Sequence, residues 1–222
     1  MTKLKNTDPR QNPSPEILDR LFQNLFELLL ANVLFMLCSL PLITAGPAAI
    51  ALERICCQIH REEKVPVFQI FFQTFGRYFG RGLFLSIVVL PLFLFSGLCI
   101  FAFYSEERLG LMALCAVMFL LASGLLQYLA PLVSATELPF EKQLKNAAIL
   151  LFLCPLRTLA GGIGSLSLLL LLLWQPKFML ALCFVILLSV HGYFRSYLAL
   201  QGAQKYIFDP YYASKEKNIR VR

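Results

Sequence analysis

Charged residues are scarce in this chain of 222 residues, where Lys, Arg, Asp and Glu together make up 15%. A soluble domain carries roughly 25%. Hydrophobic residues make up 58% and the mean hydropathy is +0.69. This composition excludes an ordinary soluble domain and indicates several membrane-spanning helices. The first twenty residues are polar and include three prolines, so we expect no cleaved signal peptide.

The sequence also lacks the motifs of metal, nucleotide and redox chemistry. Its seven cysteines form no CxxC or zinc pattern. No stretch resembles a nucleotide loop, a haem site or a nucleic-acid reader. We therefore expect no metal, no cofactor and no nucleic-acid partner, and we relate the net charge of +7 to membrane topology instead.

A hairpin broken by prolines stands near the N-terminus. About twenty apolar-rich residues lead into the sequence Ser39-Leu-Pro-Leu-Ile-Thr-Ala-Gly-Pro47, and about a dozen follow it. Pro41 and Pro47 lack an amide proton and restrict the residues before them, so one helix cannot run straight through. We expect a cytoplasmic tail over residues 1–20, a first span over 21–40 and a shorter second span over 47–60.

Further apolar stretches predict spans over residues 83–103, 109–132, 158–174 and 178–200, followed by a basic cytoplasmic tail over 201–222. Phenylalanines recur at helical spacing in residues 67–79. They predict an amphipathic helix that lies at the membrane interface or is docked on the bundle. The predicted fold class is all-α: a polytopic transmembrane helical bundle of five to six membrane segments, forming one domain over residues 21–200.

Lysine and arginine positions bear on the number of crossings. If residues 47–60 cross the membrane, the N-terminal tail, the loop 61–81, the connection 133–157 and the C-terminal tail share one side. Only Arg108 and Lys177 then lie opposite, which is a clear positive-inside distribution. We therefore expect six crossings with both termini in the cytoplasm, and five as the alternative. The expected partner is the lipid bilayer with its anionic inner leaflet.

A candidate polar cluster lies within the hairpin: Glu27, Asn32, Glu53, Arg54 and His60. Unpaired ionisable groups in a membrane cost several kcal/mol, so such residues are functional candidates. If the two arms start at equal depth, Glu27 comes level with His60, and Asn32 lies beside Glu53 and Arg54. Two interpretations stay open. The residues either fix the register of the hairpin, or they line a cytoplasm-facing cavity in which the Arg54 guanidinium binds a small polar or anionic ligand.

A membrane hydrolase is a further possibility, because Ser165 and Ser167 lie in one span and His191 in the next. Counted from the turn between these spans, Ser165 and His191 differ in depth by about 6 Å at the α-helical rise. We therefore expect that the protein is not an enzyme.

Residues near the N-terminus resemble the YesL-like family of bacterial integral membrane proteins, a domain of unknown function numbered 624. The resemblance rests on Asn24-Leu-Phe26, the run from Asn32 to Ala49, Arg61-Glu-Glu63, the segment Phe71–Phe79 and Gly82, within about the first 85 residues. It implies a bacterial plasma membrane protein whose family often neighbours genes for sugar uptake systems. It supplies no catalytic residue. On this resemblance we expect an accessory or regulatory component associated with carbohydrate uptake, with subunits of that system as further partners. The alternative is a small-solute transporter or channel.

Overall fold

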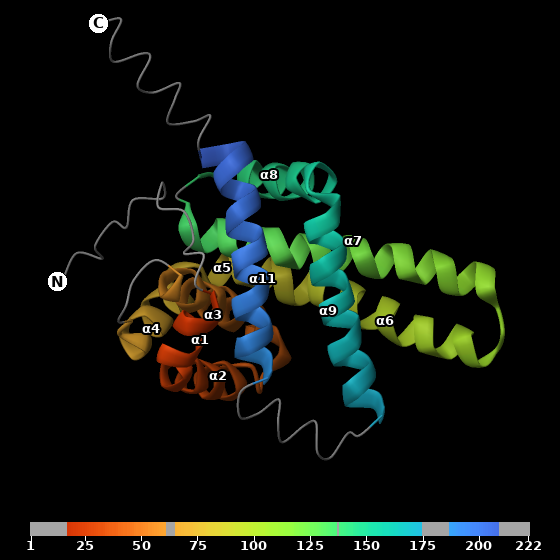
Figure 1. Cartoon of the computed structure of the whole chain (residues 1–222), viewed down its shortest axis with the longest axis horizontal. Helices are drawn as coiled ribbons and strands as arrows, with labels where there is room; N and C mark the ends of the chain where they lie inside the picture. Colours follow the sequence, from red (N-terminus) through yellow and green to blue (C-terminus); the bar gives the residue numbers. More distant parts are fainter. Residues whose placement is uncertain (1–16, 61–64, 137, 175–186, 209–222) are drawn as a thin grey trace, which may run out of the picture.

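The computed structural model describes residues 17–60, 65–136, 138–174 and 187–208. Throughout these ranges the regular elements are helices, which confirms the all-α class (Figure 1). In chain order they are α1 (Ile17–Gln23), α2 (Leu25–Cys38), η1 (Leu42–Thr44), α3 (Ala45–Ile59), α4 (Val67–Arg77), α5 (Phe79–Phe84), η2 (Leu85–Val89), α6 (Leu90–Ser105), α7 (Leu109–Ala135), α8 (Phe140–Leu153), α9 (Pro155–Trp174), α11 (Leu188–Ala203) and η4 (Gln204–Phe208). Most of both predicted tails, and the first half of the span expected over 178–200, lie outside the described residues.

The first span is not the single helix expected over residues 21–40. α1 and α2 meet at Asn24 with a bend of 72°. The Asn24 side-chain amide donates to the carbonyl of Arg20 at 2.9 Å, and its backbone leaves the helical region at φ −112°, ψ 25°. The backbone amide of Asn24 donates to the same carbonyl at 3.1 Å, so the side chain adds a second bond at the bend. The straight part of the arm is therefore α2 alone.

The break between the hairpin arms lies where the prolines predict it. After α2 ends, the hydroxyl of Thr44 lies 2.6 Å from the carbonyl of Cys38 and 2.8 Å from that of Pro41, and it shares its one proton between them. These bonds satisfy carbonyls that the end of a helix leaves without intrahelical partners. The second arm begins at Ala45, two residues earlier than expected, because Pro47 fits within its first turn.

Helix α3 occupies the centre of the molecule. All of its residues are buried except Ala49 and Arg54, and it contacts α2, α4, α5, α7 and α11. Gly46, near the start of α3, packs closely against the backbone of α5. A Cβ on Gly46 would strike the carbonyl of Gly82, and a Cβ on Gly82 would strike the backbone of Pro47. The amide of Gly46 also donates to the Ser86 hydroxyl at 2.6 Å, so the start of α3 is held directly against α5 and η2.

The segment from α5 to α6 runs through a π-helical turn, η2. Pro91 follows this turn, and a proline would remove one hydrogen bond and crowd the carbonyl four residues earlier in a regular helix. The wider π turn just before it offers the backbone a different pairing. This accounts for an uninterrupted path from residue 79 to residue 105.

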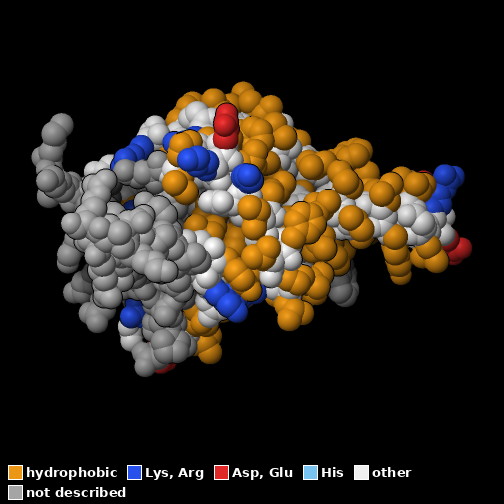
Figure 2. Space-filling model, turned by 90° about the horizontal axis from the view of Figure 1, so that it is seen from above, with side chains coloured by type: hydrophobic (Ala, Val, Ile, Leu, Met, Phe, Trp, Pro, Cys, Tyr) orange, Lys and Arg blue, Asp and Glu red, His pale blue; other side chains and the backbone are white. Residues whose placement is uncertain are grey.

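Helices α6 and α7 lie side by side and extend beyond the other helices as a long arm (Figure 1). Hydrophobic side chains cover the arm, and acidic and basic side chains gather at its tip (Figure 2). The tip holds an ion pair of 3.3 Å between Arg108 and Glu106. An apolar arm with a charged end is the distribution expected of a helical hairpin in a bilayer.

Three helical stretches are long and apolar enough to cross a membrane: Leu42–Ile59, Phe79–Tyr104 and Leu109–Ser134. Two bent pairs raise this number to five if each is one span, namely α1 with α2 and α8 with α9, which meet at 97°. The described residues thus support a membrane protein with a helical bundle. A sixth crossing depends on residues 178–186, which lie outside them.

The phenylalanine-rich helix expected over residues 67–79 is present as α4. Phe71 is buried against the core around α3, while Phe68 and Phe72 are exposed. The helix is thus docked on the bundle through one face. Its opposite face is exposed and carries phenylalanine as well as glutamine side chains. Of the two placements that the sequence left open, the described contacts show the docked one.

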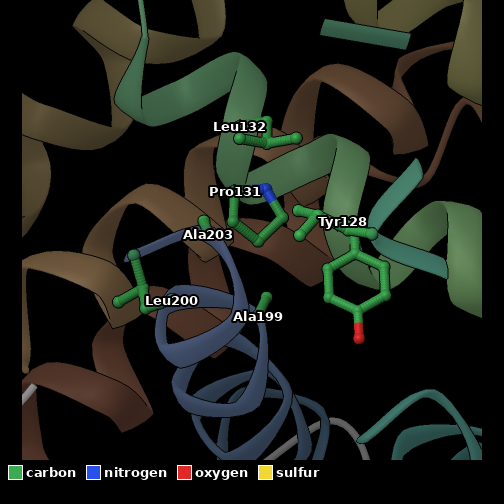
Figure 3. A pocket seen from close by; sticks show the side chains of 7 residues that line it. Tyr128, Pro131, Leu132, Ala199, Leu200 and Ala203 are labelled. Carbon is green, nitrogen blue, oxygen red and sulfur yellow. The ribbon is translucent and has the colours of Figure 1, made fainter. Parts of the chain in front are cut away.

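Helix α7 contains Pro131, which faces α11 at Ala199 and Ala203 (Figure 3). The pocket between them, completed by Tyr128, Leu132, Leu150 and Leu200, has a volume of about 10 Å³. That is about the smallest space that holds one water molecule. We treat it as a packing defect beside a proline, not as a binding site.

The contact between Gly46 and Gly82 predicts that Gly82→Ala destabilises the fold. The added methyl must displace the backbone of Pro47, and overpacking of this kind typically costs about 1–3 kcal/mol. The matched control is Gly80→Ala on the same helix, where a Cβ meets nothing within 4 Å; it should leave stability unchanged or raise it by up to about 1 kcal/mol. Thermal unfolding in detergent measures both, and equal midpoints for the two variants would contradict the packing described.

Candidate functional site

A partly open cleft of about 380 Å³ lies where α2, α3, α6, α7, α9 and α11 meet. Its volume falls within the range of small-molecule sites in proteins. Most of its lining is apolar, for example Phe35, Phe93 and Leu169. Four lining residues are polar: Glu53 of α3, Ser165 of α9, and His191 and Arg195 of α11.

An ion pair joins the two helices on either side of the cleft. Glu53 Oε1 lies 3.2 Å from Arg195 Nη2. Both side chains are largely buried, with 6% of the Glu53 side chain and 15% of the Arg195 side chain exposed. Taking such charges out of water is costly, and their mutual attraction offsets the cost only when further hydrogen bonds complete the pair.

Two atoms of the pair lack such further bonds. Glu53 Oε2 and Arg195 Nε are buried and have no hydrogen-bond partner among the described residues. Buried polar atoms are nearly always paired in proteins, so an exception needs an explanation. Here an acceptor and a donor without partners belong to two residues that line the same cleft.

Ser165 and His191 also meet in the cleft, and the expected difference in depth was wrong. Ser165 Oγ lies 3.1 Å from His191 Nε2. Gly164 lies against the imidazole, with its Cβ position 3.4 Å from His191 Cε1. The glycine thus leaves room for the imidazole beside α9. Among the described residues, His191 is therefore satisfied by the side chain of Ser165.

The hydroxyl of Ser165 also has a second partner. Its Oγ lies 2.9 Å from the carbonyl of Gly161, which can only accept. The serine has one proton for these two contacts, and the tautomer of His191 determines which group donates across the 3.1 Å contact between them. A serine nucleophile requires the arrangement in which the imidazole accepts the serine proton.

The five residues of the candidate polar cluster do not form one group. Glu53 lies in the cleft. Asn32 is buried where α2 meets α11, and its Oδ1 accepts from the amide of Ser189 at 3.1 Å. Arg54 points to the end of α7, where its guanidinium donates to the carbonyl of Ser134 at 2.6 Å. A cation at a helix C-terminus is favourably placed against the helix dipole.

His60 and Glu27 are not the level pair that the hairpin register suggested. His60 Nε2 lies 3.0 Å from the carbonyl of Tyr193 and 3.1 Å from Ser196 Oγ, and its ring stacks on that of Tyr193. The nearby end of α3 is covered by Arg20, which donates to the carbonyl of His60 at 3.0 Å. The bend at Asn24 changes the register that the sequence argument assumed, and the half-buried Glu27 has no hydrogen bond to His60 among the described contacts.

Sequence reasoning missed Arg195, although a signal for it existed. The span expected over residues 178–200 contains this arginine one helical turn after His191. A charge within an apolar span requires a partner of opposite charge. Glu53, a carboxylate in another apolar stretch, could have been proposed as that partner. The match could not be seen without knowing that α11 packs on α3.

Comparison with known families adds one finding. Residues 28–100 match the family described as "Protein of unknown function, DUF624". This stretch of the chain is similar to that family. The match confirms the resemblance seen in the sequence; it begins within α2, ends within α6 and includes Glu53. The matched region thus supplies one half of the ion pair, whereas Arg195, His191 and Ser165 come from the chain beyond it. No curated protein and no solved structure matches the chain.

The ion pair predicts strongly non-additive stability effects. Arg195→Met leaves Glu53 as an uncompensated buried charge, which typically costs about 3–5 kcal/mol. The double variant Glu53→Met/Arg195→Met removes both charges and should regain most of that loss, because apolar replacements of a buried pair are often neutral. Unfolding midpoints of the single and double variants form the measurement. Additive losses in the double variant would show that the two residues are not coupled.

Proposed function

We propose that the protein is an accessory or regulatory membrane component of a carbohydrate uptake system, and that it responds to a small ligand held in the cleft. The observation that carries the ligand-binding part is the pair of buried atoms without partners, Glu53 Oε2 and Arg195 Nε, on the wall of a cleft of about 380 Å³. The link to carbohydrate uptake rests on the family resemblance alone.

The placement of the other polar residues favours binding over transport. A transporter needs a polar path through the middle of the membrane. Asn32 and Arg54 instead make contacts to α11 and α7 between packed helices. The polar side chains of the cleft come from α3, α9 and α11 and lie together at the junction of these helices. A single polar cluster is typical of a binding site, whereas a transport pathway needs polar groups along its length.

A hydrolase is the second candidate, because Ser165 and His191 are within hydrogen-bond distance. A competing acceptor argues against it, since the carbonyl of Gly161 also lies within hydrogen-bond distance of the Ser165 hydroxyl, at 2.9 Å. We propose that the pair shapes the wall of the cleft and is not catalytic. A fluorophosphonate probe, which reacts with activated serines, should leave Ser165 unmodified in the full-length protein; modification lost in Ser165→Ala would establish the hydrolase.

We also propose that the protein resides in the bacterial cell membrane with both termini in the cytoplasm. Two contacts support one shared side for the loop 61–81 and the connection 133–157. Arg81 donates to Gln143 Oε1 at 3.2 Å, and Arg54 in the second half of α3 donates to the carbonyl of Ser134 near the end of α7. The positive-inside distribution assigns that side to the cytoplasm.

Cysteine labelling of intact cells tests this topology. Ile43→Cys, at an exposed position between the hairpin arms, should react with a membrane-impermeant maleimide added outside. Gln73→Cys on the exposed face of α4 should not react until the cells are opened. The unsubstituted chain gives the background of the native cysteines. Reaction of Gln73→Cys from outside would place α4 on the exterior and remove this topology.

Filling the cleft should abolish the proposed role. Ala49→Phe introduces a large side chain on the half-buried position of α3 that lines the cleft. Ala160→Phe makes the same change on the exposed surface of α9, outside the cleft, and serves as the control. In a strain that lacks the gene, uptake of labelled sugars should change. The wild-type protein and the control should restore it, whereas Ala49→Phe should not.

Equal rescue by both variants, with both present at wild-type amounts in the membrane, would show that the cleft is irrelevant to the role. Unchanged uptake of every sugar in the deletion strain would overturn the link to carbohydrate uptake.

A further inference from the structure

We propose that the cleft binds a neutral amphiphile: a single alkyl chain whose head both donates and accepts hydrogen bonds, such as a primary amide or a glycerol monoester. This inference rests on the proposed ligand-binding function and specifies its ligand class.

The head group is defined by the two unsatisfied atoms. Glu53 Oε2 can only accept a hydrogen bond while the carboxylate is ionised, and Arg195 Nε can only donate one. They belong to two residues that are already joined to each other, through Oε1 and Nη2 at 3.2 Å. A head that satisfies both must therefore offer a donor and an acceptor close together. An amide and a glycerol monoester do so, and a hydrocarbon does not.

The charge of the head follows from the balance of the pair. Glu53 and Arg195 contribute opposite charges, so the site they form is neutral as a whole. An anionic head would approach Arg195 but also meet the Glu53 carboxylate, and a cationic head would meet the Arg195 guanidinium. Desolvation of a charged head in this apolar surrounding is costly without a full counter-charge. His191 Nε2 is already engaged with Ser165 and supplies no counter-charge for it.

The rest of the cleft specifies the apolar part of the ligand. Apart from the four polar residues, the walls are formed by apolar side chains and glycine from six helices, among them Phe35, Phe93, Leu126 and Leu169. An alkyl chain against these walls is removed from water along most of its length, which stabilises binding in proportion to the area covered. A sugar or another small polar solute would leave these walls without a matching partner.

Photo-crosslinking of the full-length protein in phosphatidylcholine nanodiscs tests the proposal. Four dodecyl probes carry the same diazirine in the chain and differ only in the head: a primary amide, a glycerol monoester, a carboxylate and an amine. Crosslinked sites are located by peptide mapping. We expect the two neutral probes to label α3, α9 and α11 at least about tenfold more than the charged ones, and comparison of the amide with the monoester distinguishes the two neutral chemistries.

Charge variants provide a readout that a purely structural role would not give. Glu53→Gln leaves a net positive cleft and should shift the preference to the carboxylate probe. Arg195→Gln leaves a net negative one and should shift the preference to the amine. Ala49→Phe gives the background labelling, and the wild-type panel is sufficient if a charge variant does not fold.

The outcomes separate the two proposals. Strongest labelling of the cleft by a charged probe in the wild-type protein overturns the neutral-amphiphile inference and leaves ligand binding in place. If no probe labels the wild-type protein more than it labels Ala49→Phe, this inference is overturned. The same result also removes the support for a ligand in the proposed function. Preferential labelling by either neutral probe supports both.

Discussion

The burial of α3 is the constraint on which the other contacts depend. This helix is in contact with five others, so each of its side chains must suit a different neighbour. Glycine at position 46 permits the backbone of α5 to approach, Arg54 reaches the end of α7, and Glu53 faces α11. A central helix of this kind cannot shift in one direction without losing contacts in another. It therefore holds the carboxylate of Glu53 at a fixed position in the cleft.

The site combines groups that are far apart in the sequence. Glu53 comes from the second hairpin arm, and Arg195 and His191 come from the last described helix of the bundle, α11. The same helix also satisfies Asn32 and His60, through Ser189 and through Tyr193 with Ser196. α11 thus acts as the polar partner of the hairpin. The polar residues of the hairpin, which looked like one cluster in the sequence, are distributed along it.

Features controlled by local chemistry could be predicted from the sequence, and features controlled by packing could not. The helical class, the break at Pro41 and the docked or interfacial helix around Phe71 follow from composition, proline geometry and periodicity. The bend at Asn24 coincides with a local side-chain hydrogen bond to the carbonyl of Arg20, which polarity alone does not reveal. The pairing of Glu53 with Arg195 and of Ser165 with His191 depends on which helices are neighbours. Equal-depth counting failed for both sites because it assumed straight helices at regular spacing.

The unequal lengths of the helices have a consequence for the surrounding lipid. α2 has 14 residues and α7 has 27, which correspond to about 21 Å and about 40 Å at the α-helical rise. The hydrocarbon core of a bilayer is about 30 Å thick. A bilayer that matches one of these helices fails to match the other, so the long α6–α7 arm must tilt while lipid thins beside the hairpin. The molecule would then prefer membranes, or regions of a membrane, that tolerate such a step in thickness.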